Sequence, residues 1–199
     1  MRSAQGGSPL GGEVKMLAFY IIGGIAVLAI FWVIALYNGL VSLNVRCNEA
    51  FSDIDVQTKR RYDLIPNLVE AVKGYAKQES SVFENVTKAR SEAMQAKDFG
   101  DKAQAEDALS GTLKSLFAVA ENYPELKSNQ NFLSLQQELS DTENKIENSR
   151  RYYNANVRDF NIKIHRFPET IFAKNLGFKE DKRMFEAAVA EREAVKVQF

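Results

Sequence analysis

An uncharged stretch close to the amino terminus constrains this 199-residue chain more than any other feature. No Asp, Glu, Lys or Arg occurs between Met16 and Val45, and residues 17–37, LAFYIIGGIAVLAIFWVIALY, are almost wholly apolar. At a rise of about 1.5 Å per residue, a helix of this length spans roughly 30 Å, the hydrocarbon thickness of a bilayer. A tryptophan and a tyrosine lie towards its far end, where aromatic side chains favour the membrane interface. The stretch therefore predicts a transmembrane helix over residues 16–38.

Two other interpretations of the stretch are weaker. A cleaved signal peptide has a shorter apolar core and a small-residue cleavage site, and residues 17–37 fit neither property. A lipoprotein signal places small apolar residues before the modified cysteine, but Cys47 follows Asn44-Val45-Arg46. We therefore treat the helix as retained, behind a short polar tail.

The charges that flank the stretch favour an extracytoplasmic body by a narrow margin. Arg2, Lys15 and the amino terminus precede the stretch, and only Arg46 follows it closely. Because positive charge accumulates on the cytoplasmic side, this balance keeps the amino terminus in the cytoplasm. A wider window that includes Lys59-Arg60-Arg61 reverses the balance and predicts the opposite orientation.

The composition argues against several classes of function. Lys plus Arg and Asp plus Glu both number 26, so the formal net charge is zero and nucleic acid is not an expected partner. The single cysteine, Cys47, allows neither an intramolecular disulfide nor a thiolate zinc cluster. The single histidine, His165, leaves little scope for imidazole chemistry. We expect no cofactor and no metal ion.

Beyond the apolar stretch, the spacing of apolar residues predicts four helices. The first continues from the membrane to Arg61, with apolar steps of three and four that make Cys47 a small core residue. Asp63 caps the second helix, about 64–97, and Pro66 fits its first turn, where the missing N–H is not needed. A kinked continuous helix through this point is the alternative.

The third and fourth helices are bounded by breaks in the pattern. The third spans about 102–122, after a break at Phe99-Gly100-Asp101, and Pro124 ends it. The fourth, about 129–167, has the most regular pattern and stops before Pro168. Its near-heptad seam comprises Phe132, Leu135, Leu139, Ile146, Tyr153, Phe160, Ile164 and Phe167, with Thr142, Ser149 and Asn156 at the remaining positions.

Strand patterns are absent, so the sequence predicts an all-α fold. We expect a single N-terminal transmembrane helix followed by an antiparallel four-helix bundle with long helices. After the fourth helix, Leu176-Gly177-Phe178 and Phe185 are apolar points that attach the end of the chain to the bundle. The predicted segments are the tail at 1–15, the transmembrane helix at 16–38, the bundle at 39–185 and a C-terminal tail at 186–199.

Three long motifs give the chain a specific family resemblance. They are SDIDVQTKRRYDLIPNLVEAVKGYA at 52–76, LFAVAENYPELKSNQNFLSLQQELSDTENKI at 116–146 and SRRYYNANVRDFN at 149–161, followed by Phe167-Pro168 and Phe185. With these motifs, the chain from about Tyr37 onward resembles the LemA family. Small departures from the family pattern are Phe51 in place of Trp, Thr58 in place of Leu and Gln78 in place of His.

The resemblance implies a fold and a location more than an activity. LemA proteins are bacterial, with an amino-terminal transmembrane helix and a soluble four-helix body, and their molecular function is recorded as uncertain. We therefore expect a single-pass protein of the bacterial cytoplasmic (inner) membrane.

The polar residues of these motifs do not form a recognisable catalytic set. Asp53 and Asp55 lie two residues apart, and so on different faces of a helix, which does not suit an acid–base or metal pair. Glu138, Asp141 and Glu143 lack the Glu-x-x-His partner of di-iron bundles. Because reactions need groups whose protonation states are tuned against each other, we predict that the chain is not an enzyme.

We interpret the polar motifs as structural or interaction sites instead. Bidentate arginine–carboxylate bonds fix the register of neighbouring helices, and mixtures of charged, amide and aromatic groups suit recognition surfaces. Solvated charge is the alternative for each residue taken alone. The candidate residues are Asp53, Asp55, Arg60, Arg61, Asp63, Pro66, Arg150, Arg151, Tyr153 and Asn154.

The sequence thus predicts a membrane-anchored, non-enzymatic scaffold or interaction protein that self-associates. Its expected partners are the lipid bilayer, further copies of itself and another membrane protein. The alternative is a membrane-shaping or lipid-engaging oligomer, in which long helices press against the bilayer surface and bend it.

Overall fold

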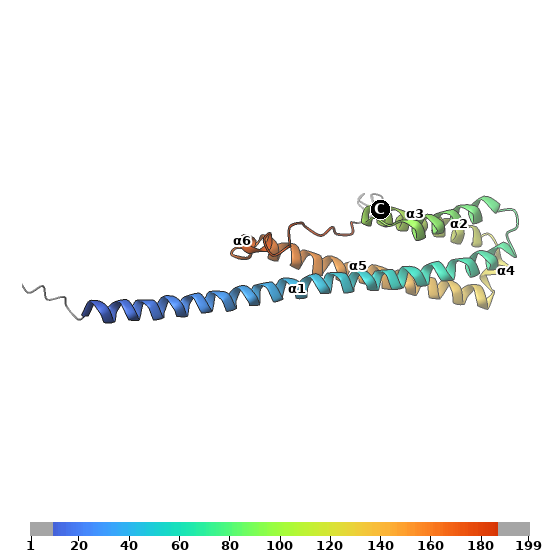
Figure 1. Cartoon of the computed structure of the whole chain (residues 1–199). Coiled ribbons are helices and arrows are strands. Elements are labelled where there is room, and N and C mark those ends of the chain that lie inside the picture. The colour runs from blue at the N-terminus through green and yellow to red at the C-terminus, as the bar shows by residue number, and fades with distance from the viewer. Residues whose placement is uncertain (1–9, 187–199) are drawn as a thin grey trace, which may run out of the picture.

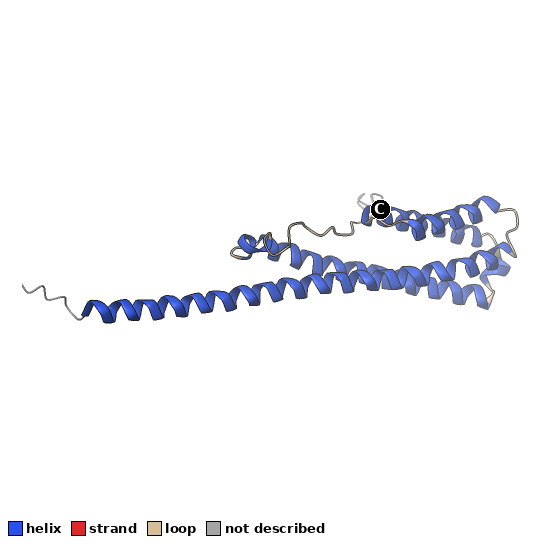
Figure 2. Ribbon diagram, viewed as in Figure 1, coloured by secondary structure: helices blue, strands red, loops and turns tan. Residues whose placement is uncertain are grey.

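The computed structural model describes residues 10–186, with side chains from residue 14 onward. All secondary structure in this range is helical, which confirms the all-α prediction (Figures 1 and 2). The predicted tails at 1–15 and 186–199 lie mostly outside the described residues. The helices are α1 (Leu10–Lys73), α2 (Ser80–Gln95), α3 (Phe99–Ala120), α4 (Pro124–Lys127), α5 (Gln130–His165) and α6 (Glu169–Ala173).

α1 is one uninterrupted helix of 64 residues that contains both the apolar stretch and the first part of the body. The predicted helix start at Asp63 is therefore wrong, and the chain follows the continuous alternative, with Pro66 inside α1. A proline leaves the carbonyl four residues earlier without its helical donor. That carbonyl belongs to Tyr62, and Arg90 of α2 donates its Nε–H to it at 2.7 Å. α1 thus tolerates Pro66 because α2 supplies the missing hydrogen bond.

The predicted second helix, 64–97, is divided between two helices. Its first part completes α1, which ends before Gly74, and its second part is α2. The apolar stripe continues across this turn because Ala76, within the turn, and Val86, in α2, are buried in the same core. Because the apolar stripe runs through the turn without a break, the sequence pattern did not indicate that the chain reverses direction there.

Capping side chains set the starts of α3 and α5. α3 begins at Phe99, earlier than predicted, and the Asp98 carboxylate accepts a hydrogen bond from the amide of Gly100 at 2.9 Å. The side chain of Asn129 accepts from the amides of the second and third residues of α5, at 2.9 and 3.1 Å. Caps of this kind satisfy amides that have no partner within the helix. The predicted span of α5 is correct to within two residues at each end.

The seam predicted for α5 is buried along most of its length. Phe167 is the exception, because α5 ends at His165 and the Phe167 side chain lies 74% exposed beyond it. Val157 is buried where the pattern placed the neighbouring Asn156, which is half-buried. The expected attachment of the chain end is confirmed, since Leu176, Phe178 and Phe185 pack against buried residues of α1 and α5.

The helices pack in two pairs. α5 lies along α1, and α2 pairs with α3 beside the far end of α1 (Figure 1). The first part of α1 projects alone from this body, is long and apolar enough to cross a membrane, and leaves its large side chains mostly exposed. α1 passes the predicted boundary at residue 38 without a break.

Two separate hydrophobic cores hold the body together. The distal core, far from the apolar stretch, joins α1 to α2, α3, α4 and the start of α5, and includes Leu68, Val86, Leu116 and Leu139. The proximal core, next to the stretch, joins α1 to the end of α5 and to α6, and includes Leu40, Cys47, Phe160 and Ala173. The buried polar residues among those described are Thr58, Arg61, Glu106 and Thr142.

Candidate functional site

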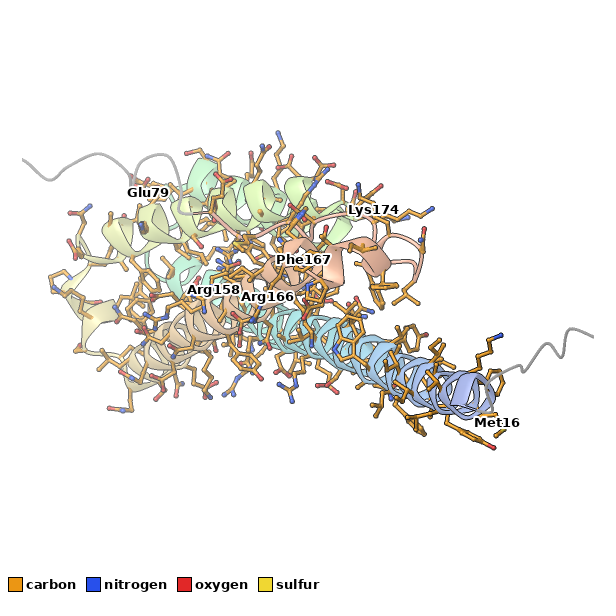
Figure 3. All side chains as sticks on the ribbon, turned by 90° about the vertical axis from the view of Figure 1, so that its left-hand side faces the viewer. Met16, Glu79, Arg158, Arg166, Phe167 and Lys174 are labelled. Carbon is orange, nitrogen blue, oxygen red and sulfur yellow. The ribbon has the colours of Figure 1, made fainter. Side chains whose placement is uncertain are left out.

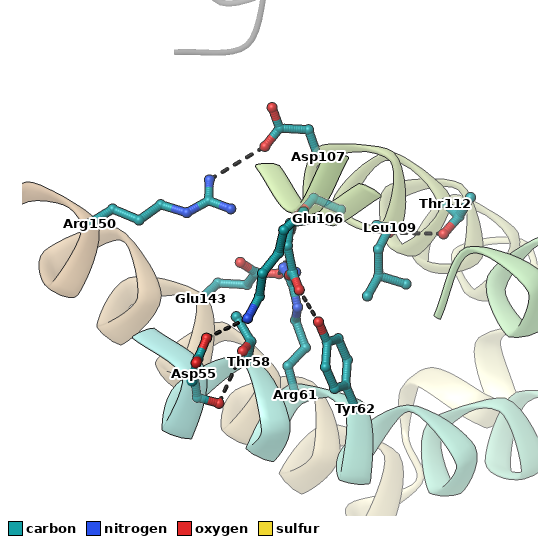
Figure 4. Close-up of polar contacts among 12 residues, drawn as sticks. Asp55, Thr58, Arg61, Tyr62, Glu106, Asp107, Leu109, Thr112, Glu143 and Arg150 are labelled. Carbon is teal, nitrogen blue, oxygen red and sulfur yellow. Dashed lines mark hydrogen bonds and ion pairs between the residues drawn. The ribbon is translucent and has the colours of Figure 1, made fainter. Parts of the chain in front are cut away.

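Arg61 is the centre of a polar layer between the two cores. Its side chain is 1% exposed, and it lies on α1 between Ile54 of the proximal core and Ile65 of the distal core. One terminal nitrogen, Nη1, lies 2.5 Å from a carboxylate oxygen of Glu143 and donates to the Ser110 hydroxyl at 2.9 Å. Arg61 therefore joins α1, α3 and α5 at one point (Figure 4).

Glu106 of α3 is the buried counter-charge of Arg61. It is 1% exposed, forms an ion pair with Nη2 of Arg61 and accepts a hydrogen bond from the hydroxyl of Tyr62 (Figure 4). Burial raises the pKa of Tyr62, although the neighbouring Arg61 charge lowers it. The phenol therefore stays protonated as the donor to Glu106. A buried charge pair needs hydrogen bonds of this kind to offset the loss of hydration.

Two further ion pairs lie at the edge of this layer. Asp55 of α1 pairs with Lys102 of α3, and the backbone carbonyl of Asp55 accepts from Thr58 at 3.0 Å. Arg150 of α5 lies 3.4 Å from Asp107 of α3. Each pair joins two helices, so the layer fixes how far α3 can slide along its neighbours.

Four aromatic rings gather on the proximal side of the layer. Phe99 and Phe185 have centroids 4.5 Å apart, and Tyr153 lies 5.4 Å from Phe185 and 5.7 Å from Phe51. Lys102 lies over the Phe51 ring, and the Arg150 guanidinium lies over the Phe185 ring at 5.1 Å. Ring contacts and cation–π contacts each add attraction beyond burial alone.

Two asparagines of α5 hold the extended chain that follows α6. Asn154 donates to the carbonyl of Phe185 at 2.8 Å and accepts from its amide at 2.9 Å. Asn161 makes the same two bonds with the backbone of Lys182, both at 3.0 Å. The two asparagines are seven residues apart, which is a rise of about 10.5 Å in a helix. The two backbone residues that they bind are three residues apart, which is about 10 Å in an extended chain, so the spacings match. The Tyr153 hydroxyl adds a bond to the carbonyl of Arg183 at 3.1 Å.

A groove of about 1010 Å³ lies between α3 and α5 beside the layer. Leu113, Leu139 and Ile146 lie at its floor but are at most 3% exposed, whereas Glu143 and Arg150 are charged members of its lining. A partner bound there would therefore meet charged groups, which are typical of the rim of a protein-recognition surface. Among residues 10–186, no group of three or more His, Cys, Asp or Glu is placed to hold a metal ion.

The structure brings together half of the predicted candidate residues. Asp55, Arg61, Arg150, Tyr153 and Asn154 lie in the polar layer or in the aromatic cluster beside it.

The other candidate residues lie apart from this site. Asp53, Asp63 and Pro66 are exposed on α1. Arg60 faces Glu138 at 3.9 Å, and Arg151 lies 3.2 Å from Glu147 of its own helix; the side chains of both pairs are half-exposed or more. These pairs contribute little to stability.

Sequence reasoning missed Glu106, although its position carried a signal. Glu106 stands three residues before Leu109 and so continues the buried stripe of α3. Arg61 likewise falls between Thr58 and Ile65 in the stripe of α1. A charged residue at a seam position on each of two helices indicates a buried pair. Asn161 was also missed, because its partner is backbone and no side-chain pattern marks it.

Comparisons with known proteins connect the chain to one family and to several named relatives. The sequence model of the LemA family matches residues 50–199. The chain is 25% identical over 169 residues to magnetosome protein MamQ of Magnetospirillum gryphiswaldense and 28% identical over the same length to magnetosome protein MamQ 1 of Paramagnetospirillum magneticum. Each match covers 72% of this chain and 62% of the relative, so the chain spans less than two thirds of these proteins. Protein LemA of Metamycoplasma hominis is 27% identical over 181 residues, which cover 87% of this chain and 80% of that protein.

Proposed function

The chain belongs to the LemA family, and from this premise we propose that it is a membrane-anchored, non-enzymatic scaffold that self-associates. In this proposal α1 crosses the bacterial cytoplasmic membrane once, and the antiparallel four-helix body stands on the extracytoplasmic side. The body binds further copies of itself or another membrane protein.

The unbroken course of α1 is the observation that carries this proposal. The helix passes from the apolar stretch into the body without a turn, and both hydrophobic cores are built on it. A body joined in this way cannot rotate freely about its anchor, so every copy presents the same face at the same height. A fixed presentation suits a scaffold, whereas a tethered enzyme does not need it.

The use of the charged groups supports a role in assembly rather than catalysis. Arg61 pairs with both Glu106 and Glu143, and Asp55 and Arg150 pair with residues of α3. Catalytic groups need a partner that leaves them able to exchange protons with a substrate. The groove between α3 and α5 offers contact area and charge to a partner.

The anchor supports self-association through its glycines. A Cβ atom added at Gly23 or Gly24 would meet nothing within 4 Å, so these positions are open in the single chain, and their lack of side chains allows a second helix to approach α1 closely. Tethering also confines all copies to one plane and raises their effective concentration. Weak lateral contacts are then sufficient to assemble them.

Sedimentation of the full chain in a density-matched mild detergent tests the proposal. We expect discrete species larger than a monomer at micromolar concentration. The variant Gly23→Ile/Gly24→Ile should shift the distribution towards monomer, whereas Ile25→Leu, a control in the same turn, should not. A monomer from the unchanged chain in several detergents and in nanodiscs would contradict self-association. Tubulation of liposomes by the full chain would instead favour the membrane-shaping alternative.

A further inference from the structure

The short helix α6 and its flanking residues, 166–174, lie beside the end of the apolar stretch. The Phe172 ring is in edge contact with the Trp32 indole, with centroids 5.8 Å apart. Phe178, just after this segment, lies 6.3 Å from the ring of Tyr37. Ala173 is buried in the proximal core, which fixes α6 to the body. Segment 166–174 therefore occupies the same level along α1 as the last turns of the predicted transmembrane helix.

This level corresponds to the edge of the bilayer. Trp32 precedes the predicted end of the span at residue 38 by six residues, which is about 9 Å along a helix. That depth matches the roughly 5–10 Å to which interfacial helices bury their apolar face at the boundary between headgroups and acyl chains. If α1 spans the bilayer as proposed, segment 166–174 lies at the boundary between acyl chains and headgroups.

The exposed side chains of segment 166–174 fit such a boundary. Phe167 is 74% exposed and Ile171 is 55% exposed, and neither belongs to a hydrophobic core. Arg166 and Lys174, at the two ends of the segment, are also exposed. In the view from the apolar end of α1, Arg166, Phe167 and Lys174 lie on the part of the body nearest the viewer (Figure 3). Interfacial membrane elements combine bulky apolar side chains with Lys and Arg in this way.

The acidic groups near the segment do not oppose this arrangement. Oδ1 of Asp181 lies 2.7 Å from Nε2 of His165, and Glu169 is half-buried rather than exposed beside Phe167. The exposed charges within the segment itself are therefore positive.

We propose that residues 166–174 form an interfacial membrane element that binds the anionic phospholipids around the anchor. Phe167 and Ile171 enter the leaflet from which α1 emerges, and Arg166 and Lys174 bind lipid phosphates. The body is then attached to the bilayer at two places, through α1 and through this element. The inference rests on the proposed membrane anchoring and adds a lipid-binding site to it.

The single tryptophan of the chain makes a direct test possible. Trp32→Phe removes the native fluorophore, and Phe167→Trp then places one tryptophan on the proposed element. A matched control carries Tyr152→Trp in the same background, because Tyr152 is 57% exposed on α5 and lies 13 residues before the end of that helix. Each full-length protein is reconstituted in nanodiscs of phosphatidylcholine and phosphatidylglycerol that contain lipids brominated near the headgroup. The unchanged chain, with Trp32, is measured in parallel.

We expect bromolipid to quench Trp32 and the tryptophan at position 167 and to leave the one at position 152 unaffected. Quenching at 167 should weaken when Arg166→Gln and Lys174→Gln are added, and when phosphatidylglycerol is omitted. Quenching of Trp32 without quenching at 167 would overturn the inference and leave the proposed anchoring intact. Loss of quenching at both positions would overturn both. Equal quenching with and without phosphatidylglycerol would overturn the anionic-lipid part of the inference.

Discussion

The distal and proximal cores both bury apolar side chains of α1 and α5, but they use different elements to do so. The distal core joins segments of five helices through mostly aliphatic side chains such as Val72, Leu109 and Leu116. The buried residues of the proximal core come from α1, α5 and the short α6, and aromatic side chains from the start of α3 and from the chain beyond α6 cover them. The distal core thus depends mainly on the packing of helices, whereas the proximal core also depends on residues of the non-helical chain beyond α6.

The proximal core shows how the apolar strip between two helices is shielded from solvent where no third helix runs along it. Two helices bury only a narrow strip between them, and wide aromatic rings extend that strip sideways. The covering segment has no helical hydrogen bonds of its own, so Asn154 and Asn161 satisfy its backbone. Arg61 and Glu106 then separate the two kinds of core.

The largest expected effect comes from breaking the layer between the cores. Arg61→Met should lower the free energy of unfolding by about 3–5 kcal/mol, because it leaves Glu106 as a buried charge without its partner. Urea denaturation of the full chain in mild detergent, followed by circular dichroism, measures this loss. Arg61→Met combined with Glu106→Leu should recover much of it, since apolar pairs often replace buried ion pairs without cost. A double variant no more stable than Arg61→Met would show that the layer stabilises by more than charge compensation.

A somewhat smaller effect is expected within the distal core. Leu139 is buried there, so Leu139→Ala should cost about 2–5 kcal/mol through lost transfer free energy and the cavity left behind. The nearby Gln137 is exposed, and Gln137→Ala should change stability by less than about 0.5 kcal/mol. Equal losses at both sites in the same denaturation experiment would contradict the orientation of α5.

The proximal core should respond more locally. Asn154→Ala removes two hydrogen bonds to the backbone of Phe185, a loss of about 1–3 kcal/mol that acts first on the covering segment. Limited proteolysis should therefore cleave near residues 181–186 faster, while global unfolding changes less than with Leu139→Ala. Asn156→Ala is the matched control, because Asn156 bonds only within α5, to the carbonyl of Tyr152. Unchanged cleavage in Asn154→Ala would show that the aromatic rings alone hold the segment.

The smallest expected effect is a pH dependence at Cys47. Burial raises the pKa of this thiol above its ordinary value of 9.0, so the folded chain favours the protonated form. The stabilising contribution is complete below pH 9 and is lost as the pH rises through the higher pKa of the folded state. The stability difference between the unchanged chain and Cys47→Ala should therefore be constant up to about pH 9 and decline above it. A difference that stays flat to pH 10.5 would place Cys47 in contact with solvent.

Local signals made much of the fold predictable. The start of α5 follows from the cap at Asn129, and the stripe from Leu40 to Ile54 marks the buried face of α1. Signals of this kind lie within one or two turns of the residues they affect. The continuation of α1 through Pro66 was only the alternative prediction, because the compensating donor, Arg90, lies on another helix.

The candidate site was less accessible to sequence reasoning for the same reason. Arg61 was identified as a register-fixing residue, but its partner Glu106 is distant in the chain and becomes a partner only once the helices are aligned. The backbone contacts of residues 181–186 have no periodicity to detect. The exposure of Phe167 depended on the point at which α5 ends, and element ends are where patterns are least informative.

Because α1 is uninterrupted, a tilt of its first part moves its far end sideways. Lys73 lies 36 residues beyond Tyr37 in the same helix, a distance of about 54 Å. Transmembrane helices tilt to match the thickness of the surrounding bilayer, and a change of about 10° moves a point about 54 Å away sideways by about 9 Å. A small difference in bilayer thickness is thereby converted into a displacement of the distal core comparable to the width of a helix. If α1 spans a bilayer as proposed, the lateral position of the groove over the membrane consequently depends on the lipids around the anchor.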